Sequence, residues 1–181
     1  GSKIEGIVMG PDSAILQRER VTTPPGDYTG TLAVIVGLVR KLERVVGREN
    51  LPVGLGHPGS VLPASGLMRN SNSLCLNGKP FQRDFEALLG RSIRMANDAN
   101  CLALSEASDG AAAGAKNVFA VILGTGVGGG IVINGAPVIG VNGIGGEWGH
   151  NPLPWPRPEW DEISGTLCCG GKPSCIETWL S

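Results

Sequence analysis

Hydrophobic and polar positions follow strand spacing and helix spacing in turn along the chain, a pattern that predicts an α/β fold. Residues 3–9 read as a strand, and residues 14–23 read as its hairpin partner after a turn at residues 10–13. Apolar residues recur at helical spacing over residues 28–47, so an amphipathic helix capped by Asp27 is expected there. The later elements are expected as strands at 51–56, 92–96 and 118–123 and as helices at 81–89 and 99–113.

Two stretches interrupt this pattern. Residues 57–80 are rich in Gly, Pro, Ser and Asn, so they are expected to form a long ordered loop of the kind that often carries function. A lobe boundary is expected near Gly114–Lys116. Residues 1–115 are therefore predicted to form an N-terminal lobe, and residues 116–181 the start of a C-terminal lobe.

The segment GTGVGGG at residues 124–130 contains a G-x-G-x-x-G pattern, which alone is a weak signal for a nucleotide loop. A dinucleotide loop opens a helix, but here an apolar run follows, and then Asn134-Gly135, a hairpin turn signal. The glycine loop is therefore predicted to join two strands. Its N–H groups can form an anion-binding concavity, and the alternative is a tight hairpin without a ligand.

Polar residues gather at two further places. Asn97 and Asp98 stand where a strand gives way to a helix, which suits either catalytic groups aimed into a cleft or a helix N-cap. Glu147 and His150 lie three positions apart among glycines, so one helical turn would place them on the same side. An acid and an imidazole in this setting indicate a site.

Three of the five cysteines, Cys168, Cys169 and Cys175, crowd together near the end of the sequence. With His150 they offer four N/S ligands, the set that a closed structural zinc site needs. The alternative is a group of reduced thiols without a metal. Glu177 follows Cys175 closely, and a metal there would hold its carboxylate in a fixed position.

Composition narrows the classes of partner. Hydrophobic residues make up 41% of the chain and its net charge is −1, with no long charged run. We therefore expect a globular protein that binds neither nucleic acid nor a membrane. No signal peptide and no spanning segment is seen, so a cytoplasmic location is expected.

The chain resembles the ROK family of bacterial sugar kinases and repressors, and within it the fructokinases and mannokinases. The resemblance runs over nearly the whole chain, in the family's order of motifs. These are GSKIEG at 1–6, GHPGSV at 56–61, ANDANCLALSEASDGAAAGA at 96–115, GTGVGGG at 124–130, GGEWGHNPLPW at 145–155 and CCGGKPSCIETWLS at 168–181.

The resemblance implies an actin-like, ribonuclease-H-like fold of two lobes around a cleft, and a homodimer. It implies Asp98 as catalytic base and a structural Zn²⁺. The implied sugar contacts are Gly59, Ser60, Asn72, Asn97, Asp98, Glu147, His150 and Glu177. The implied phosphate contacts are Gly1, Ser2, Lys3, Gly124, Thr125 and Gly126, and the implied zinc ligands are His150, Cys168, Cys169 and Cys175.

The chain departs from the family pattern in three respects. The family's middle cysteine would fall at Gly170, whereas here it is Cys169, so either the loop shifts or the metal has a poorer ligand set. The first phosphate motif begins at Gly1 without its strand, and the sequence stops at Ser181 before the adenosine pocket. The chain is therefore expected to be truncated at both ends.

The implied activity is transfer of the γ-phosphate of Mg-ATP to a hexose, with Asp98 accepting the hydroxyl proton. Fructose, giving fructose 6-phosphate, is the expected substrate, and mannose, glucose and N-acetylglucosamine are the alternatives. The rival functions are a sugar-sensing regulator of the same family and a kinase fragment without activity. The near-zero charge and the lack of a helix-turn-helix segment speak against the regulator.

Overall fold

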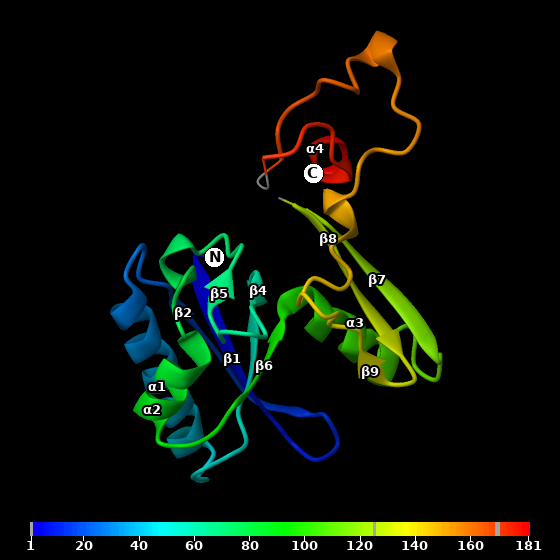
Figure 1. Cartoon of the computed structure of the whole chain (residues 1–181). Coiled ribbons are helices and arrows are strands. Elements are labelled where there is room, and N and C mark those ends of the chain that lie inside the picture. The colour runs from blue at the N-terminus through cyan, green and yellow to red at the C-terminus, as the bar shows by residue number, and fades with distance from the viewer. Residues whose placement is uncertain (1, 125, 169–170) are drawn as a thin grey trace. The chain divides into compact units, whose positions relative to one another are not determined.

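The computed structural model describes residues 2–124, 126–168 and 171–181 (Figure 1). Contacts group the chain into two compact units, residues 1–96 and 97–181. Both units combine strands with helices, as the α/β prediction requires. Among the described residues, no helix combines the length and the apolar character needed to cross a membrane.

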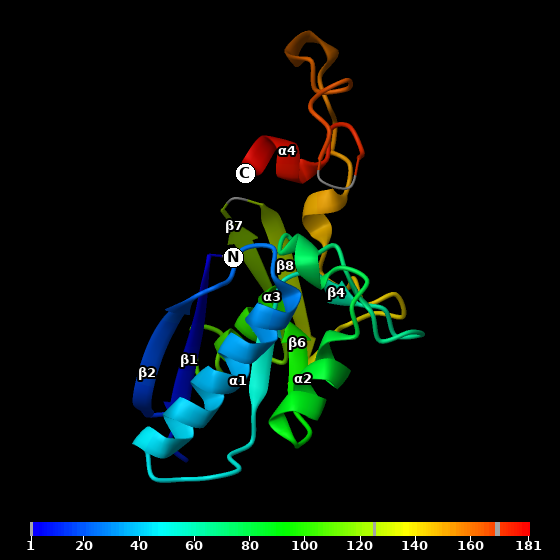
Figure 2. The ribbon, with the colours of Figure 1, turned by 90° about the vertical axis from the view of Figure 1, so that its left-hand side faces the viewer.

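The first unit begins with an antiparallel hairpin that is followed by helices packed against strands. The hairpin register pairs Lys3 with Thr22, and the glycine at position 6 lets helix α1 approach, because a Cβ there would lie 2.7 Å from Leu42. Figure 2 shows α1 alongside both the hairpin and α2. The elements are β1 (Lys3–Met9), β2 (Ile15–Thr22), α1 (Tyr28–Val45), β3 (Gly54–His57), β4 (Ser60–Val61), β5 (Met68–Arg69), a 3₁₀ turn (Leu74–Leu76), α2 (Phe81–Leu89) and β6 (Arg94–Asn97), which pairs with β3.

The core of this unit lies between the two helices and the strands. Asp27 caps α1 by accepting a hydrogen bond from the Gly30 N–H at 2.9 Å, as predicted. Helix α2 has the predicted bounds because its apolar residues fall on one face, and Phe81 and Phe85 are completely buried or nearly so. The buried cluster comprises Leu32, Ile35, Val36, Met68, Leu76, Phe81, Phe85, Leu89 and Ile93.

The second unit is a helix packed on a three-stranded antiparallel sheet, followed by an irregular segment. Its elements are α3 (Asp98–Ser108), β7 (Asn117–Leu123), β8 (Val127–Ile133), β9 (Ala136–Pro137), 3₁₀ turns at Trp148–His150 and Pro158–Trp160, and α4 (Ile176–Leu180). The strands follow the order β7-β8-β9. Leu123 pairs with Val127 and Asn117 with Ile133, so the glycine loop joins strand to strand as predicted.

Successive residues of β8 face opposite sides of the sheet, and each side is closely covered. A Cβ at Gly130 would lie 2.8 Å from Ala103 of α3 and closer still to the Ala99 carbonyl oxygen. A Cβ at Gly129 would lie 2.9 Å from the Trp148 ring. Helix α3 and the Trp148 turn therefore cover opposite faces of the same strand, and glycine allows both to approach.

Several predicted bounds differ from those in the structure by one or two residues, and three differences are larger. The strand expected at 51–56 begins at Gly54, because the Leu51 N–H donates instead to the Glu43 carboxylate. Helix α3 ends at Ser108 rather than near 113, because Gly110 favours turns and the Glu106 carboxylate accepts from the Ala111 N–H. The expected loop 57–80 contains the short β4–β5 hairpin and a 3₁₀ turn.

Other local predictions are confirmed. Asn134 and Gly135 have φ angles of 50° and 77°, the left-handed pair that a type I′ hairpin turn requires. Helix α3 packs on β7 and β8 and so groups with the second unit, although it precedes the lobe boundary expected near residue 115. That boundary remains a prediction about the lobes of the complete fold.

Candidate functional site

The N-terminus of α3 presents two polar side chains of the second unit. Asn97 is the N-cap, and its Oδ1 accepts from the N–H groups of Ala99 at 2.9 Å and Asn100 at 3.2 Å. Asp98 occupies the first turn with an exposed side chain, where the helix dipole favours a negative charge. Asn97 is therefore the N-cap, and Asp98, whose Oδ1 also accepts from the Ala99 N–H at 2.9 Å, is the acid presented to solvent.

The glycine turn joins β7 to β8, and two of its N–H groups already have partners within the protein. The Gly124 N–H donates to the Gly126 carbonyl at 3.0 Å. The N–H of Val127, the first residue of β8, donates to Oε2 of Glu177 at 3.1 Å. A Cβ at Gly126 would lie 2.9 Å from the same carboxylate oxygen. Glu177 thus reaches the glycine turn itself.

Glu147 and His150 lie at the two ends of a single 3₁₀ turn, as their spacing predicted. The turn is anchored by the Trp148 indole, whose Nε1 donates to the Gly128 carbonyl at 2.7 Å and whose ring meets Phe119 edge-on. Gly149 is also essential to this packing, because a Cβ there would collide with the Val127 carbonyl. The acid and the imidazole are therefore held against the first residues of β8.

Three ionisable groups of the second unit act on the Glu147 carboxyl. Burial raises the pKa of Glu147 above its usual range, and the charges of Asp98 and Glu177 raise it further, while His150 acts in the opposite direction. His150 Nδ1 lies 4.0 Å from Glu177 Oε1. A series of neighbouring groups therefore runs from Asp98 through Glu147 and His150 to Glu177 and the glycine turn.

A second group of side chains overlaps this one. The potential ligand atoms of His150, Cys168 and Cys175 all lie within 4.8 Å of one another, and both cysteines are buried. Two thiolates and an imidazole suit Zn²⁺, which prefers S and N ligands in tetrahedral sites. The donor set therefore fits the predicted metal, with three of the four predicted ligands gathered in one place.

Other predicted site residues belong to the first unit. Gly59 has a φ of 72°, and a Cβ there would collide with the backbone of residues 69–71. Ser60 is buried and accepts from Arg69 Nε at 3.2 Å, while Asn72 is exposed. Ser2 and Lys3 are exposed at the start of β1. Gly1, Thr125 and Cys169 lie outside the described residues.

Sequence reasoning missed two contributors to the site. The Val127 N–H is a backbone group, and no residue type signals that it will receive the Glu177 carboxylate. Trp148 stands between the two residues that the sequence singled out, and its position within that motif was the available signal. Its role is to fix the turn that presents Glu147 and His150.

Comparisons with known proteins identify the family of the chain. The ROK family model matches residues 1–181. The chain is 40% identical over 185 residues to the N-acetyl-D-glucosamine kinase of Vibrio atlanticus, a match that covers 100% of this chain and 60% of that protein. The chain thus spans 60% of the length of this curated relative.

Solved structures support the same fold. A ROK family glucokinase from Streptomyces griseus, in complex with glucose and AMPPNP, matches with a TM-score of 0.80 at 29% identity, over 98% of this chain and 54% of that one. The ROK hexokinase of Thermus thermophilus matches with a TM-score of 0.75 at 28% identity, over 97% of this chain and 58% of that one. The predicted actin-like α/β fold is confirmed by these neighbours.

Proposed function

The chain belongs to the ROK family, and we propose that the gene product carrying it is an ATP-dependent sugar kinase in which Asp98 is the general base. The observation that carries this proposal is the series of groups in the second unit. The exposed Asp98 carboxylate begins the helix that packs on β8, and Glu177 accepts a hydrogen bond from the first residue of that strand, beside the glycine turn. Phosphoryl transfer to a hydroxyl requires a base and a group of phosphate-binding donors held in fixed positions. The second unit supplies both, Asp98 on α3 and the glycine turn at the start of β8.

In the proposed reaction, a hexose hydroxyl lies against Asp98, which accepts its proton as the oxygen attacks the γ-phosphate in line. Glu147, His150 and Glu177 accept or donate hydrogen bonds to other hydroxyls, and Asn97 contributes its amide. The turn at residues 124–126 holds the phosphates, with Thr125 as a further donor. The Mg²⁺ that accompanies ATP neutralises phosphate charge. Gly59, Ser60, Asn72 and the segment 1–3 are proposed contacts from the first unit.

We propose a structural Zn²⁺ held by His150, Cys168 and Cys175, with Cys169 as the predicted fourth ligand. When bound, the metal supplies a fixed link between the 3₁₀ turn that presents Glu147 and the segment leading into α4. An imidazole has two ring nitrogens, so His150 can serve the metal with one and a sugar hydroxyl with the other. This removes the apparent conflict between its two predicted roles.

Two observations point to different hexoses as the substrate of the proposed kinase. The resemblance seen in the sequence favoured fructose, whereas the curated relative named above is an N-acetyl-D-glucosamine kinase. We therefore propose N-acetyl-D-glucosamine as the first substrate to test and fructose as its rival, with mannose and glucose alongside. A cytoplasmic homodimer remains the expected form.

The test is phosphorylation of these four sugars by the gene product and by its Asp98→Asn variant. Loss of a general base lowers turnover by about 10²–10⁴-fold, whereas sugar binding, measured by thermal stabilisation, should stay close to that of the wild type. Asp109→Asn is the matched control, because Asp109 is an exposed acid at the other end of α3. Near-normal turnover in Asp98→Asn would refute the proposed base. Sugar binding without phosphorylation by the wild type would favour a sugar-sensing regulator.

A further inference from the structure

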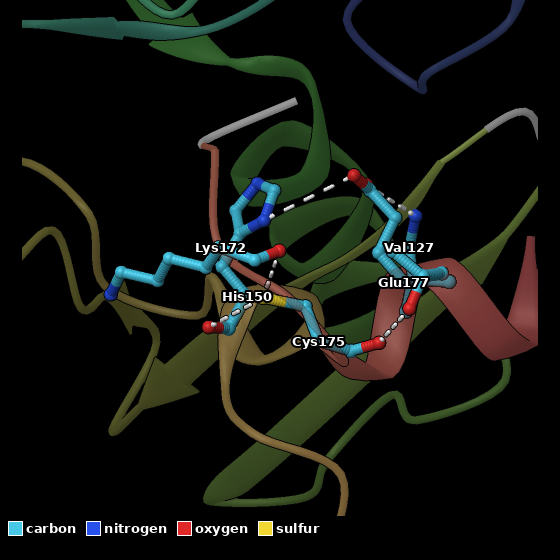
Figure 3. A network of polar contacts seen from close by, with 6 residues as sticks. Val127, His150, Lys172, Cys175 and Glu177 are labelled. Carbon is cyan, nitrogen blue, oxygen red and sulfur yellow. Dashed lines mark hydrogen bonds and ion pairs between the residues drawn. The ribbon is translucent and has the colours of Figure 1, made fainter. Parts of the chain in front are cut away.

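Glu177 uses its two carboxylate oxygens on two different segments of the second unit (Figure 3). Oε2 accepts from the Val127 N–H at 3.1 Å, next to the glycine turn. Oε1 lies 4.0 Å from Nδ1 of His150, one of the three clustered metal-ligand candidates. The side chain is only 17% exposed. Glu177 therefore lies between the metal cluster and the turn and touches both.

The position of Glu177 depends on Cys175. Helix α4 has five residues, too short to be stable by itself. It is held at its start, where Cys175 pairs with Pro152 in a β-bridge and the Ile176 N–H donates to the Asn151 carbonyl at 3.0 Å. The Cys175 side chain is almost completely buried and faces the metal cluster. A metal bound to that sulfur would fix the start of α4, and with it the carboxylate two residues later.

We propose that Glu177 is a positioning residue that couples metal binding at His150, Cys168 and Cys175 to the order of the glycine turn. This inference rests on the metal site and the phosphate-binding turn of the proposed function. With the metal bound, the carboxylate holds the Val127 N–H and so fixes the point where the turn enters β8. Gly126 leaves room for the carboxylate, since a Cβ there would crowd Oε2.

Loss of the metal is therefore expected to change the glycine turn, which contains none of the metal ligands. Once Cys175 is released, α4 loses one of its attachments, the carboxylate withdraws, and the Val127 N–H loses its acceptor. The turn then holds phosphate less well. If Glu177 acted only as a sugar contact, metal removal would leave both the Val127 amide and phosphate binding unchanged.

The direct test is hydrogen exchange at the Val127 amide, in the protein loaded with Zn²⁺ and after chelation, with zinc content measured on the same samples. A hydrogen bond to a charged acceptor corresponds to roughly ten- to a hundredfold slower exchange. Exchange should accelerate by that factor on chelation, and equally in zinc-loaded Glu177→Ala. Glu177→Gln keeps an acceptor oxygen and should restore protection. Glu162→Ala is the matched control, because Glu162 also accepts a backbone N–H, that of Arg157, in an exposed loop away from β8.

A second measurement is the affinity for pyrophosphate, used as the probe of the turn. It should fall in zinc-loaded Glu177→Ala and recover in Glu177→Gln. Tighter pyrophosphate binding by Glu177→Ala would overturn the inference, because the carboxylate would then obstruct the turn. So would unchanged Val127 exchange in that variant, which tests the contact without removing the metal.

The outcomes separate the inference from the function on which it rests. If the protein binds stoichiometric zinc but the exchange rate of the Val127 amide changes neither on chelation nor in Glu177→Ala, the metal site is supported and the coupling is refuted. A protein that binds no zinc under any condition overturns the metal site and the coupling together. Neither result affects the role of Asp98, which depends on turnover alone.

Discussion

Replacement of Gly130 by alanine tests the close packing of α3 on β8, which sets the position of Asp98. The new Cβ would lie 2.8 Å from the Ala103 Cβ and would overlap the Ala99 carbonyl oxygen. Neither neighbour can move aside as a flexible side chain would, because one is helix backbone and the other is a methyl group attached to it. The helix itself must shift away from the strand.

Gly128 of the same strand provides a matched control. Among the described residues, no atom lies within 4 Å of a Cβ built at Gly128. Overpacking a close-fitting site costs about 1–3 kcal/mol, while replacing Gly by Ala gains about 0.4–1 kcal/mol by restricting the unfolded chain. The second effect is common to both variants. Gly130→Ala should therefore be about 1–3 kcal/mol less stable than Gly128→Ala, a difference that follows from the packing alone.

The assay is denaturant unfolding followed by tryptophan fluorescence. All four tryptophans, at positions 148, 155, 160 and 179, lie in the second unit, so the signal reports that unit. Two variants of equal stability would refute the packing argument. An unchanged unfolding slope in both variants is needed for the comparison, since the slope reports the surface exposed on unfolding.

Two further predictions concern a cap and a buried ion pair. Asn97→Ala removes the acceptor of the Asn100 N–H and one of the two acceptors of the Ala99 N–H, the other being Asp98 Oδ1. It should destabilise the second unit by about 1 kcal/mol in the same fluorescence assay, while Asn97→Asp keeps the cap and the stability. Arg91→Ala leaves the nearly buried Glu43 carboxylate without its 2.6 Å ion-pair partner and should destabilise the first unit by about 3 kcal/mol, measured by circular dichroism. Adding Glu43→Gln should recover part of that loss; a double variant no more stable than Arg91→Ala would show that the charge is not the cause.

Sequence patterns correctly predicted the elements whose conformation is decided by residues within the element. Helix α2 has its predicted bounds because Phe81 and Phe85 fix its buried face and Gly90 adopts the left-handed conformation that ends it. The turn at Asn134-Gly135 follows from the φ angles these residues tolerate. In both cases the residues that carry the signal also make the decisive interactions.

Chemistry predicted part of the site as well. His150, Cys168 and Cys175 were grouped by ligand type, and the structure brings them together although 25 residues separate His150 from Cys175. The contact between Glu177 and the Val127 N–H was not predictable, because a backbone donor has no sequence signature. The end of α3 was missed because the alanines after Gly110 favour a helix that Glu106 interrupts by accepting the Ala111 N–H.

Four of the five glycines of residues 124–130 separate into two groups by what surrounds them. Gly129 and Gly130 are required by the protein, since a Cβ at either position would collide with Trp148 or with α3. Gly124 and Gly128 have no such neighbours among the described residues, and neither has a positive φ angle. Gly128 lies on the same face of β8 as Gly130, two residues nearer the turn. Packing and backbone conformation thus leave these two glycines unexplained, and close approach of a ligand would explain both. Gly124 belongs to the turn at which we propose that phosphate binds, and Gly128 lies on the face of β8 that is covered by α3, the helix that begins with Asp98.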